Sequence, residues 1–181
     1  ANASLYNESS QLWEYPQFVT IFNNTFVNNA ATVTSDNTQQ GYSGAIATEN
    51  GGVFTVFNNI FSGNSAENTD ANDPTNDFNP WNSEYVWQFG HNNTRYMDYL
   101  NDRYGSNNIY RDPKFVLDGS NDQYALSDAS FLIGAGALSY EGQVAPSIDI
   151  LGNSRPTVDP DKPDMGAYEN SNISPPYPDK E

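Results

Sequence analysis

The stretch FNNTFVNNAA at residues 22–31 returns as FNNIFSGNSA at residues 57–66, so the chain repeats itself after 35 residues. The similarity extends over 18–31 and 53–66, where short β-branched and aromatic runs indicate strands and paired asparagines indicate turns. Internal repeats of about 20–50 residues are typical of solenoids, propellers and arrays. We therefore predict an all-β fold, a short right-handed parallel β-helix (solenoid). A chance duplication within a β-sandwich is the alternative.

The paired asparagines have a physical role in such a fold. Successive coils of a parallel β-helix stack about 4.8 Å apart, which would place Asn23 and Asn24 directly over Asn58 and Asn59. Asparagine tolerates the left-handed backbone of a sharp bend, and stacked asparagines can hydrogen-bond to each other as a ladder. Two aromatic pairs are expected to stack inside the coils in the same way, Phe22 with Phe57 and Phe26 with Phe61.

The composition restricts the classes of partner. The net charge is −16, from 23 acidic and 7 basic residues, which argues against nucleic acid and anionic membrane surfaces. There is no cysteine, and no apolar run approaches the roughly 18 residues of a membrane span. The acidity and the start without Met fit a secreted or cell-surface protein. Five sequons are candidate glycosylation sites: Asn2, Asn7, Asn23, Asn92 and Asn172.

The sequence divides into five segments. Residues 1–17 form a cap or docking segment, 18–66 form the repeated coils, and 67–110 form an aromatic-rich side excursion with a short helix near 95–103. Residues 111–170 form a closing β-helix segment, and the Pro-rich residues 171–181 form a tail. A structureless loop as long as the excursion is uncommon inside a compact domain. We therefore expect the excursion to pack beside the coils through its aromatic side chains.

Two parts of the sequence resemble extracellular β-helix families. Ser43–Ile46 (SGAI), with FVNN at 26–29 before it and FSGN at 61–64 after it, resembles the repeat of polymorphic outer membrane proteins, in which a glycine stands at the place of Ser43. The last third resembles the closing segment of secreted bacterial right-handed β-helix proteins of the choice-of-anchor Q group. Its matching motifs are Asp112-Pro113-Lys114-Phe115, Tyr124-Ala125-Leu126, Ser130 to Gly136, Asp149, Gly152, Arg155-Pro156 and Asp164-Met165-Gly166-Ala167-Tyr168-Glu169, with Met165 in place of isoleucine.

This resemblance implies a secreted β-helix protein, and on that basis the closing motif has a structural role. The guanidinium of Arg155 is expected to make bidentate hydrogen bonds with Asp149 or Asp164, which would fix the final turn.

Parallel β-helix proteins include polysaccharide lyases and hydrolases, so catalytic candidates need to be considered. A lyase needs a cation beside the uronate carboxylate and a base for the neighbouring proton. The candidates are His91, which is the single histidine, and Arg95. A solvated or capping role is the favoured explanation for His91. A polygalacturonase-type hydrolase would contain an Asp-Asp pair and Gly-His-Gly, and the sequence contains neither.

Two further groups are binding candidates. Asp70, Asp73 and Asp77 offer hard oxygen ligands for Ca²⁺, although turn formation explains the same residues and no other cofactor is indicated. An aromatic group would either stack on a polysaccharide or fasten the excursion to the coils. Its members are Trp81, Tyr85, Trp87, Tyr96 and Tyr99.

The N-terminal segment contains apolar residues with nothing evident to bury them: Leu5, Tyr6, Leu12, Trp13 and Tyr15. They either cap the first coil or dock on something else, because an open coil end exposes strand edges and an apolar cross-section. The docking partner would be upstream β-helix coils or a second copy, whose head-to-tail contact builds a filament. We therefore expect a non-catalytic extracellular module with a structural, adhesive or self-assembling role. The alternative is the C-terminal part of a polysaccharide lyase or hydrolase.

Overall fold

Short β-strands account for most of the regular structure of this protein. The computed structural model describes residues 5–7 and 12–14 (backbone only), 18–32, 43–48, 53–67, 70, 73–80, 86–157 and 162–172. Within these residues there is one short α-helix, α1 (Met97–Arg103), and one turn of 3-10 helix, η1 (Pro74–Asn76). The all-β prediction is confirmed, and the helix lies inside the segment for which it was expected.

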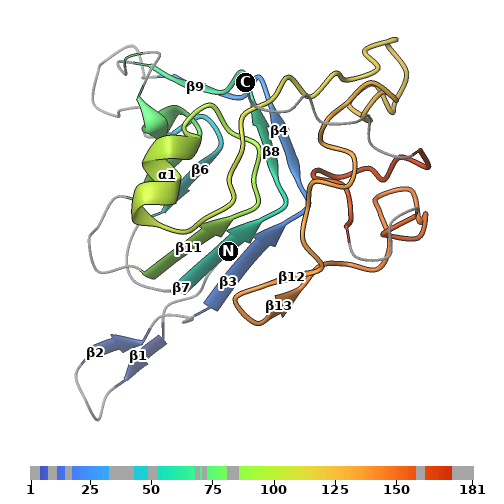
Figure 1. The fold of residues 1–181 in the computed structure, drawn as a ribbon. Helices are drawn as coiled ribbons and strands as arrows, with labels where there is room; N and C mark the ends of the chain where they lie inside the picture. The colour runs from blue at the N-terminus through green and yellow to red at the C-terminus, as the bar shows by residue number, and fades with distance from the viewer. Residues whose placement is uncertain are drawn as a thin grey trace.

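The repeated sequence forms a three-stranded parallel sheet (Figure 1). Strand β7 (Val53–Phe57) lies between β3 (Phe18–Phe22) and β11 (Val86–Gly90). The pairing keeps the sequence register, so that Phe22 lies opposite Phe57 and Phe57 lies opposite Gly90. The chain therefore returns to the same path after one repeat.

Three more strand pairs follow the same rule, each parallel and each joining one repeat to the next. They are β4 (Thr25–Val27) with β8 (Ile60–Ser62), β5 (Ala30–Ala31) with β9 (Ser65–Ala66), and β6 (Ile46–Thr48) with β10 (Phe78–Pro80). We call β3–β6 the first layer, β7–β10 the second layer, and β11 with residues 91–94 the third layer. The prediction that 67–110 is a side excursion is wrong, because β10 and β11 belong to the stacked layers.

Aromatic side chains fill the space enclosed by these strands. Alternate residues of β7 point inward, and Phe54 and Val56 are buried there together with Phe61, Phe89 and Leu100. The rings of Phe26 and Phe61 stack with centroids 5.0 Å apart, and those of Phe22 and Phe57 lie 5.5 Å apart. The predicted interior stack of Phe26 and Phe61 is therefore confirmed. Phe22 and Phe57 are in contact but tilted by 45°, and Phe57 packs against Tyr140 of the closing segment, so their predicted place inside the coils is not confirmed.

The two ends of the stack differ in their cover. At the third layer, Leu100 of α1 is fully buried in the core, and residues 104–109 follow β11 along its outer edge. Backbone hydrogen bonds run from Phe89 N to Tyr104 O at 2.8 Å and from His91 N to Ser106 O at 3.2 Å. The outer edge of β11 is thus covered.

At the first layer, by contrast, strands β3, β4 and β5 have no strand on their outer side within the described residues. Phe18 is 74% exposed. Val19, Ile21 and Phe26 are only partly buried, whereas Phe54, Val56 and Phe61 at the same positions of the second layer are buried. Among the described residues, the first layer is therefore an open end with the apolar pattern of an internal layer.

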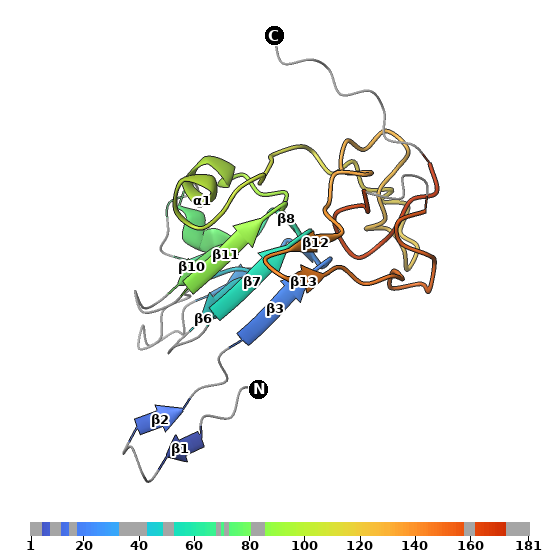
Figure 2. The same ribbon diagram turned by 60° about the horizontal axis from the view of Figure 1, so that its bottom comes forward.

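The closing segment packs on the flank of the layers and does not extend them (Figure 2). Its regular structure, in the described residues, is a small antiparallel hairpin of β12 (Ser139–Tyr140) and β13 (Gln143–Val144). A second apolar cluster joins it to β8, formed by Ile60, Leu126, Leu132, Ile133 and Met165. The prediction of a closing β-helix segment at 111–170 is therefore wrong in its placement, because these residues cover the outer side of the stack.

The N-terminal docking candidates fall on a hairpin. Strands β1 (Leu5–Asn7) and β2 (Leu12–Glu14) pair antiparallel, with Tyr6 opposite Trp13. Both views show the hairpin apart from the stacked layers. Tyr15 lies outside the described residues.

The difference between the two ends leads to a matched prediction about stability. Phe61 is 2% exposed, so Phe61→Ala should lower the free energy of unfolding by about 3–5 kcal/mol through lost burial and a cavity. Phe26→Ala, at the same position of the open layer, should cost clearly less. Urea unfolding of both variants measures the difference, and equal losses would contradict an open first layer.

Candidate functional site

An asparagine ladder runs through all three layers. The side-chain oxygen of Asn59 accepts hydrogen bonds from the backbone N–H and side-chain amide of Asn24, at 2.9 and 3.1 Å. The oxygen of Asn92 accepts the same two bonds from Asn59, both at 2.9 Å. Asn92 in turn donates to Asn108, at 3.1 and 3.0 Å, and Asn108 donates to Asn101. A second ladder begins with Asn29, which donates to Asn64.

Each ladder residue also satisfies backbone groups at the bend. The amide of Asn59 donates to the carbonyl oxygens of Phe57 and Ile21, both at 2.9 Å. The residue before each ladder asparagine has a positive φ, namely 52° at Asn23, 57° at Asn58 and 54° at His91. The predicted bend and the predicted ladder are both confirmed, because asparagine supplies the left-handed backbone and the stacking hydrogen bonds.

The ladder has a direction, and its open end lies in the first layer. Each asparagine oxygen accepts from the layer before it, so the oxygens of Asn24 and Asn29 lack a donor within the described part of the chain. Both residues are exposed. A preceding layer would supply the missing backbone and side-chain N–H groups.

The closing segment is hydrogen-bonded to the stacked layers at these bends. The side chain of Asn58 exchanges two hydrogen bonds with the backbone of Ala137, at 2.7 and 2.8 Å. Gly166 N donates to Asn58 O at 2.8 Å, and Ala167 N donates to the Thr25 hydroxyl at 3.0 Å. Gly166 has a φ of 92°, and a Cβ there would lie 2.6 Å from Ile60, so this position requires glycine.

Arg155 pairs with a carboxylate other than the two that were expected. Its Nε lies 3.0 Å from Oε2 of Glu169, and both side chains are buried. Asp164 accepts backbone N–H groups of Gly134 and Asn170, both at 2.7 Å. Asp149 accepts Glu169 N at 3.0 Å. The expected Asp149 or Asp164 pairing is therefore corrected to Glu169, while the two aspartates bind backbone groups of the same turn.

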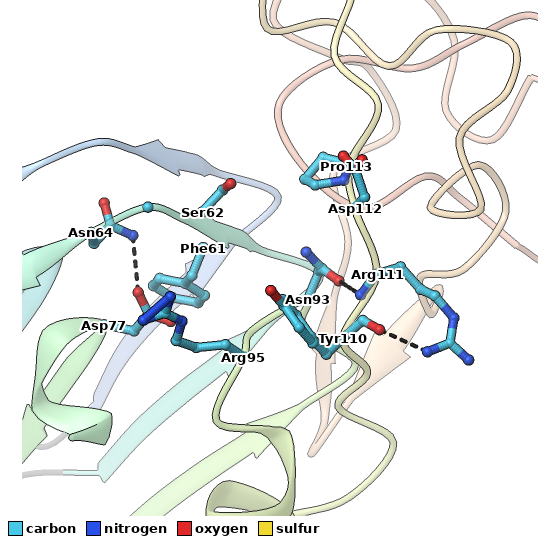
Figure 3. A pocket seen from close by; sticks show the side chains of 11 residues that line it. Phe61, Ser62, Asn64, Asp77, Asn93, Arg95, Tyr110, Arg111, Asp112 and Pro113 are labelled. Atoms are coloured by element: carbon cyan, nitrogen blue, oxygen red, sulfur yellow. Dashed lines mark hydrogen bonds between the residues drawn. The ribbon is translucent and has the colours of Figure 1, made fainter. Parts of the chain in front are cut away.

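A polar pocket of about 300 Å³ opens beside the second and third layers (Figure 3). Asn64, Asp77 and Arg95 lie on one side of it, and Asn93 and Tyr110 lie on the other. The remaining lining residues are Phe61, Ser62, Gly63, Arg111, Asp112 and Pro113. Asn93 Oδ1 accepts Arg111 N at 2.8 Å, while its Nδ2 is buried without a hydrogen-bond partner in the described residues.

Hydrogen bonds fix the carboxylate of Asp77 on one side of this pocket. Its carboxylate accepts hydrogen bonds from the Thr94 hydroxyl at 2.8 Å and from the Asn64 amide at 3.1 Å. Burial raises the pKa of Asp77, and the bonds from Thr94 and Asn64 and the charge of Arg95 offset part of this rise. Asp77 therefore serves as an acceptor at the end of the second ladder.

The two catalytic candidates are not brought together. His91 takes the bend position of the third layer, where its ring lies against Tyr140 and 3.3 Å from the Asn107 amide. Burial lowers the pKa of His91. Arg95 lines the polar pocket, and His91 does not. The structure thus favours the capping explanation for His91.

The calcium candidates have other roles in the structure. Asp73 caps η1 by accepting Thr75 N at 2.9 Å, and Asp77 is committed to Thr94 and Asn64. The described residues contain no group of three or more His, Asp or Glu side chains that could hold a metal ion. Calcium binding by Asp70, Asp73 and Asp77 stays a prediction.

The aromatic patch proves to be largely a packing group. Trp87 is buried with its ring 4.3 Å from that of Phe54, and Tyr96 is buried with its hydroxyl bonded to Asn76. Tyr99 is partly buried against the same core. An exposed patch is therefore wrong for Trp87 and Tyr96, and fastening to the core explains them. Trp81 and Tyr85 lie outside the described residues.

The sequons differ in accessibility. Asn92 is fully buried and Asn23 is nearly so, and the amides of both donate to backbone carbonyls. A glycan on either amide is incompatible with this packing. Asn172 is exposed, and its amide donates to Asp128 at 2.7 Å. The side chain of Asn7 and the whole of Asn2 lie outside the description.

The pocket could not be inferred from the sequence, because its residues come from four separate segments, 61–64, 77, 93–95 and 110–113. The one available signal was HNNT at 91–94, a shortened form of the FNN repeat. It marks a third layer and so places Asn93 next to the polar residues after β8.

Comparisons with protein-family models, curated proteins and solved structures give no significant match. In the described residues no helix has the length and apolar character required to cross a membrane.

The ladder predicts unequal effects for two equivalent asparagines. Asn59→Ala should lower the free energy of unfolding by several kcal/mol, because each buried group left unpaired costs about 1–3 kcal/mol and Asn59 is fully buried. Asn24→Ala should cost about 1 kcal/mol or less, since Asn24 is exposed. Denaturant unfolding of the pair measures this, and a larger loss for Asn24→Ala would refute the ladder.

The closing motif predicts a pH effect. Burial raises the pKa of Asp164 from 3.8 to about 7, so the folded protein holds a proton that the unfolded chain releases across this range. The free energy of unfolding should therefore fall as the pH rises from about 4 to about 7. Asp164→Asn should reduce this slope, as measured by thermal unfolding at several pH values. The exposed Asp118→Asn is the control and should leave the slope unchanged.

Proposed function

We propose that the chain forms a short right-handed parallel β-helix that serves as a non-catalytic structural or adhesive module of a secreted or cell-surface protein. In this proposal the stacked layers are coils, α1 and residues 104–109 cap one end, and the first layer docks on another coil. The observation that carries the proposal is the contrast between the two ends. The outer edge of β11 is covered, while β3, β4 and β5 present unpaired edges and partly buried apolar residues within the described part of the chain.

The ladder limits what the docking partner can be. Two copies facing each other about a two-fold axis would set the acceptor oxygens of Asn24 and Asn29 against the same oxygens of the other copy. Head-to-tail stacking would need an open third layer, and that edge is covered. A preceding coil of the same β-helix, with asparagines at the two ladder positions, satisfies both the oxygens and the strand edges. We therefore favour a preceding coil over self-assembly into filaments.

The extracellular setting is supported by the sequence. The acidity agrees with it, and so does the resemblance of the last third to secreted proteins of the choice-of-anchor Q group. The residues that carry the resemblance also have structural roles. Gly166 hydrogen-bonds to the flank of the layers, and Glu169 pairs with Arg155 in the final turn. A lyase or hydrolase is less well supported, because His91 and Arg95 serve different parts of the structure.

A tandem insertion tests the docking surface. A second copy of residues 18–52 placed directly before residue 18 should stack on the first layer and bury Val19, Ile21 and Phe26. We expect a higher unfolding temperature, together with slower amide hydrogen exchange in β3 and β4, because their edges become paired. Mass spectrometry of deuterium uptake measures the second effect.

A control insertion isolates the ladder. In it, the inserted copy carries alanine at its equivalents of Asn24 and Asn29, so that the side-chain amide donors are lost while the backbone N–H donors and the length are kept. This chain should gain less protection than the first insertion. If exchange in β3 and β4 is unchanged by either insertion, the proposal of an open coil end fails.

A further inference from the structure

The polar pocket contains a buried hydrogen-bond donor with nothing to bind. Asn93 is 1% exposed, and its Nδ2 has no partner in the described residues. Its orientation is fixed, because Oδ1 must face the N–H of Arg111 at 2.8 Å. In Figure 3 the nitrogen is turned away from Arg111 toward the space between Ser62 and Asp112. Leaving a buried amide donor unpaired costs stability, so a hydrogen-bond acceptor placed at this position would be bound favourably.

The position of Asn93 explains why this donor is unpaired. It occupies the column of Thr25 and Ile60. The closing segment covers those two residues, with Ala167 N on the Thr25 hydroxyl and Leu126, Leu132 and Met165 around Ile60. At the third layer the chain has instead just left the stack at residues 110–113, which form one wall of the pocket. Of Thr25, Ile60 and Asn93, Asn93 is therefore the one that lines the pocket.

The other groups in the pocket suit a ligand with both donors and acceptors. Tyr110 is 51% exposed and presents an aromatic ring with a polar end. The carboxylates of Asp77 and Asp112 and the guanidinium of Arg95 also line the space. A hydroxyl group can accept from Asn93 and at the same time donate to a carboxylate. A volume of about 300 Å³ lies at the small end of ligand sites.

We propose that this pocket binds one or two units of a neutral saccharide, with a sugar hydroxyl on Asn93 Nδ2 and a sugar face on the Tyr110 ring. The lining contains two acidic residues, Asp77 and Asp112, and two basic residues, Arg95 and Arg111, so the local charges balance and suit a neutral ligand. The net charge of −16 on the whole chain further disfavours an anion. This proposal does not rest on docking at the first layer, since every residue it uses follows β7. The two proposals can therefore fail separately.

The test is a titration of the full chain with neutral oligosaccharides. The probes are maltohexaose, cellohexaose and mannohexaose, with trigalacturonate as the anionic comparison. We expect at least one neutral probe to shift the Asn93 side-chain amide signals in ¹H–¹⁵N NMR spectra. Calorimetry of that probe then gives the dissociation constant for the wild type and the variants.

Two variants report on the two contacts. Asn93→Asp keeps the shape and the acceptor for Arg111 N but removes the donor, and Tyr110→Ala removes the exposed ring without touching the core. Each should weaken binding about tenfold. Ile148→Ala is the control, since Ile148 is exposed on the closing segment and does not line the pocket. Asn93→Asp places a charge in a buried site. If Asn93→Asp fails to fold, the binding affinity of Tyr110→Ala alone tests the proposal.

Three results would overturn the proposal. The first is that no neutral probe shifts the Asn93 amide signals, and the second is that Tyr110→Ala binds as tightly as the wild type. The third is that trigalacturonate binds more tightly than every neutral probe, which would assign the site to an acidic ligand.

Discussion

The hydrogen bond between one asparagine and the next is the interaction on which the rest of this structure depends. It sets the spacing of the layers, because each oxygen must lie within reach of two N–H groups of the layer before it. It also shapes the bends, since the same amides satisfy backbone carbonyls that would otherwise be buried without a partner. The aromatic stacks follow from this spacing, as flat rings fill the interval between layers with little loss of contact.

The layers with the clearest repeat could be predicted from the sequence. Residues 18–31 and 53–66 agree at so many positions that strand register, bends and ring stacking could all be inferred. The third layer was missed because it returns after 33 residues instead of 35 and carries His91 at the bend position. Its aromatic residues looked like a surface group, although Trp87 and Tyr96 complete the interior.

The candidate sites were harder to infer, since they depend on contacts between distant segments. The partner of Arg155 could not be chosen from sequence, because the closing motif offers Asp149, Asp164 and Glu169, and only the folded turn places Glu169, the most distant of the three along the chain, beside it. The pocket at Asn93 joins residues that follow β8, precede β10 and follow α1. No local sequence pattern indicates such a site, because each residue has an ordinary structural explanation when it is considered alone.

The hydrogen bonds between the closing motif and the first bend have a consequence for the order of folding. Asn23 donates to the carbonyl of Asp164 at 3.0 Å, across a separation of 141 residues. Contacts that far apart along a chain are slow to form, since a long loop must close before any stabilisation is gained. During synthesis on a ribosome, Asn23 of the first bend could not form its hydrogen bond with Asp164 until almost the whole sequence has emerged. The fold would therefore be completed in a late, concerted step, and a chain that is stopped before residue 164 would keep its layers without their outer fastening.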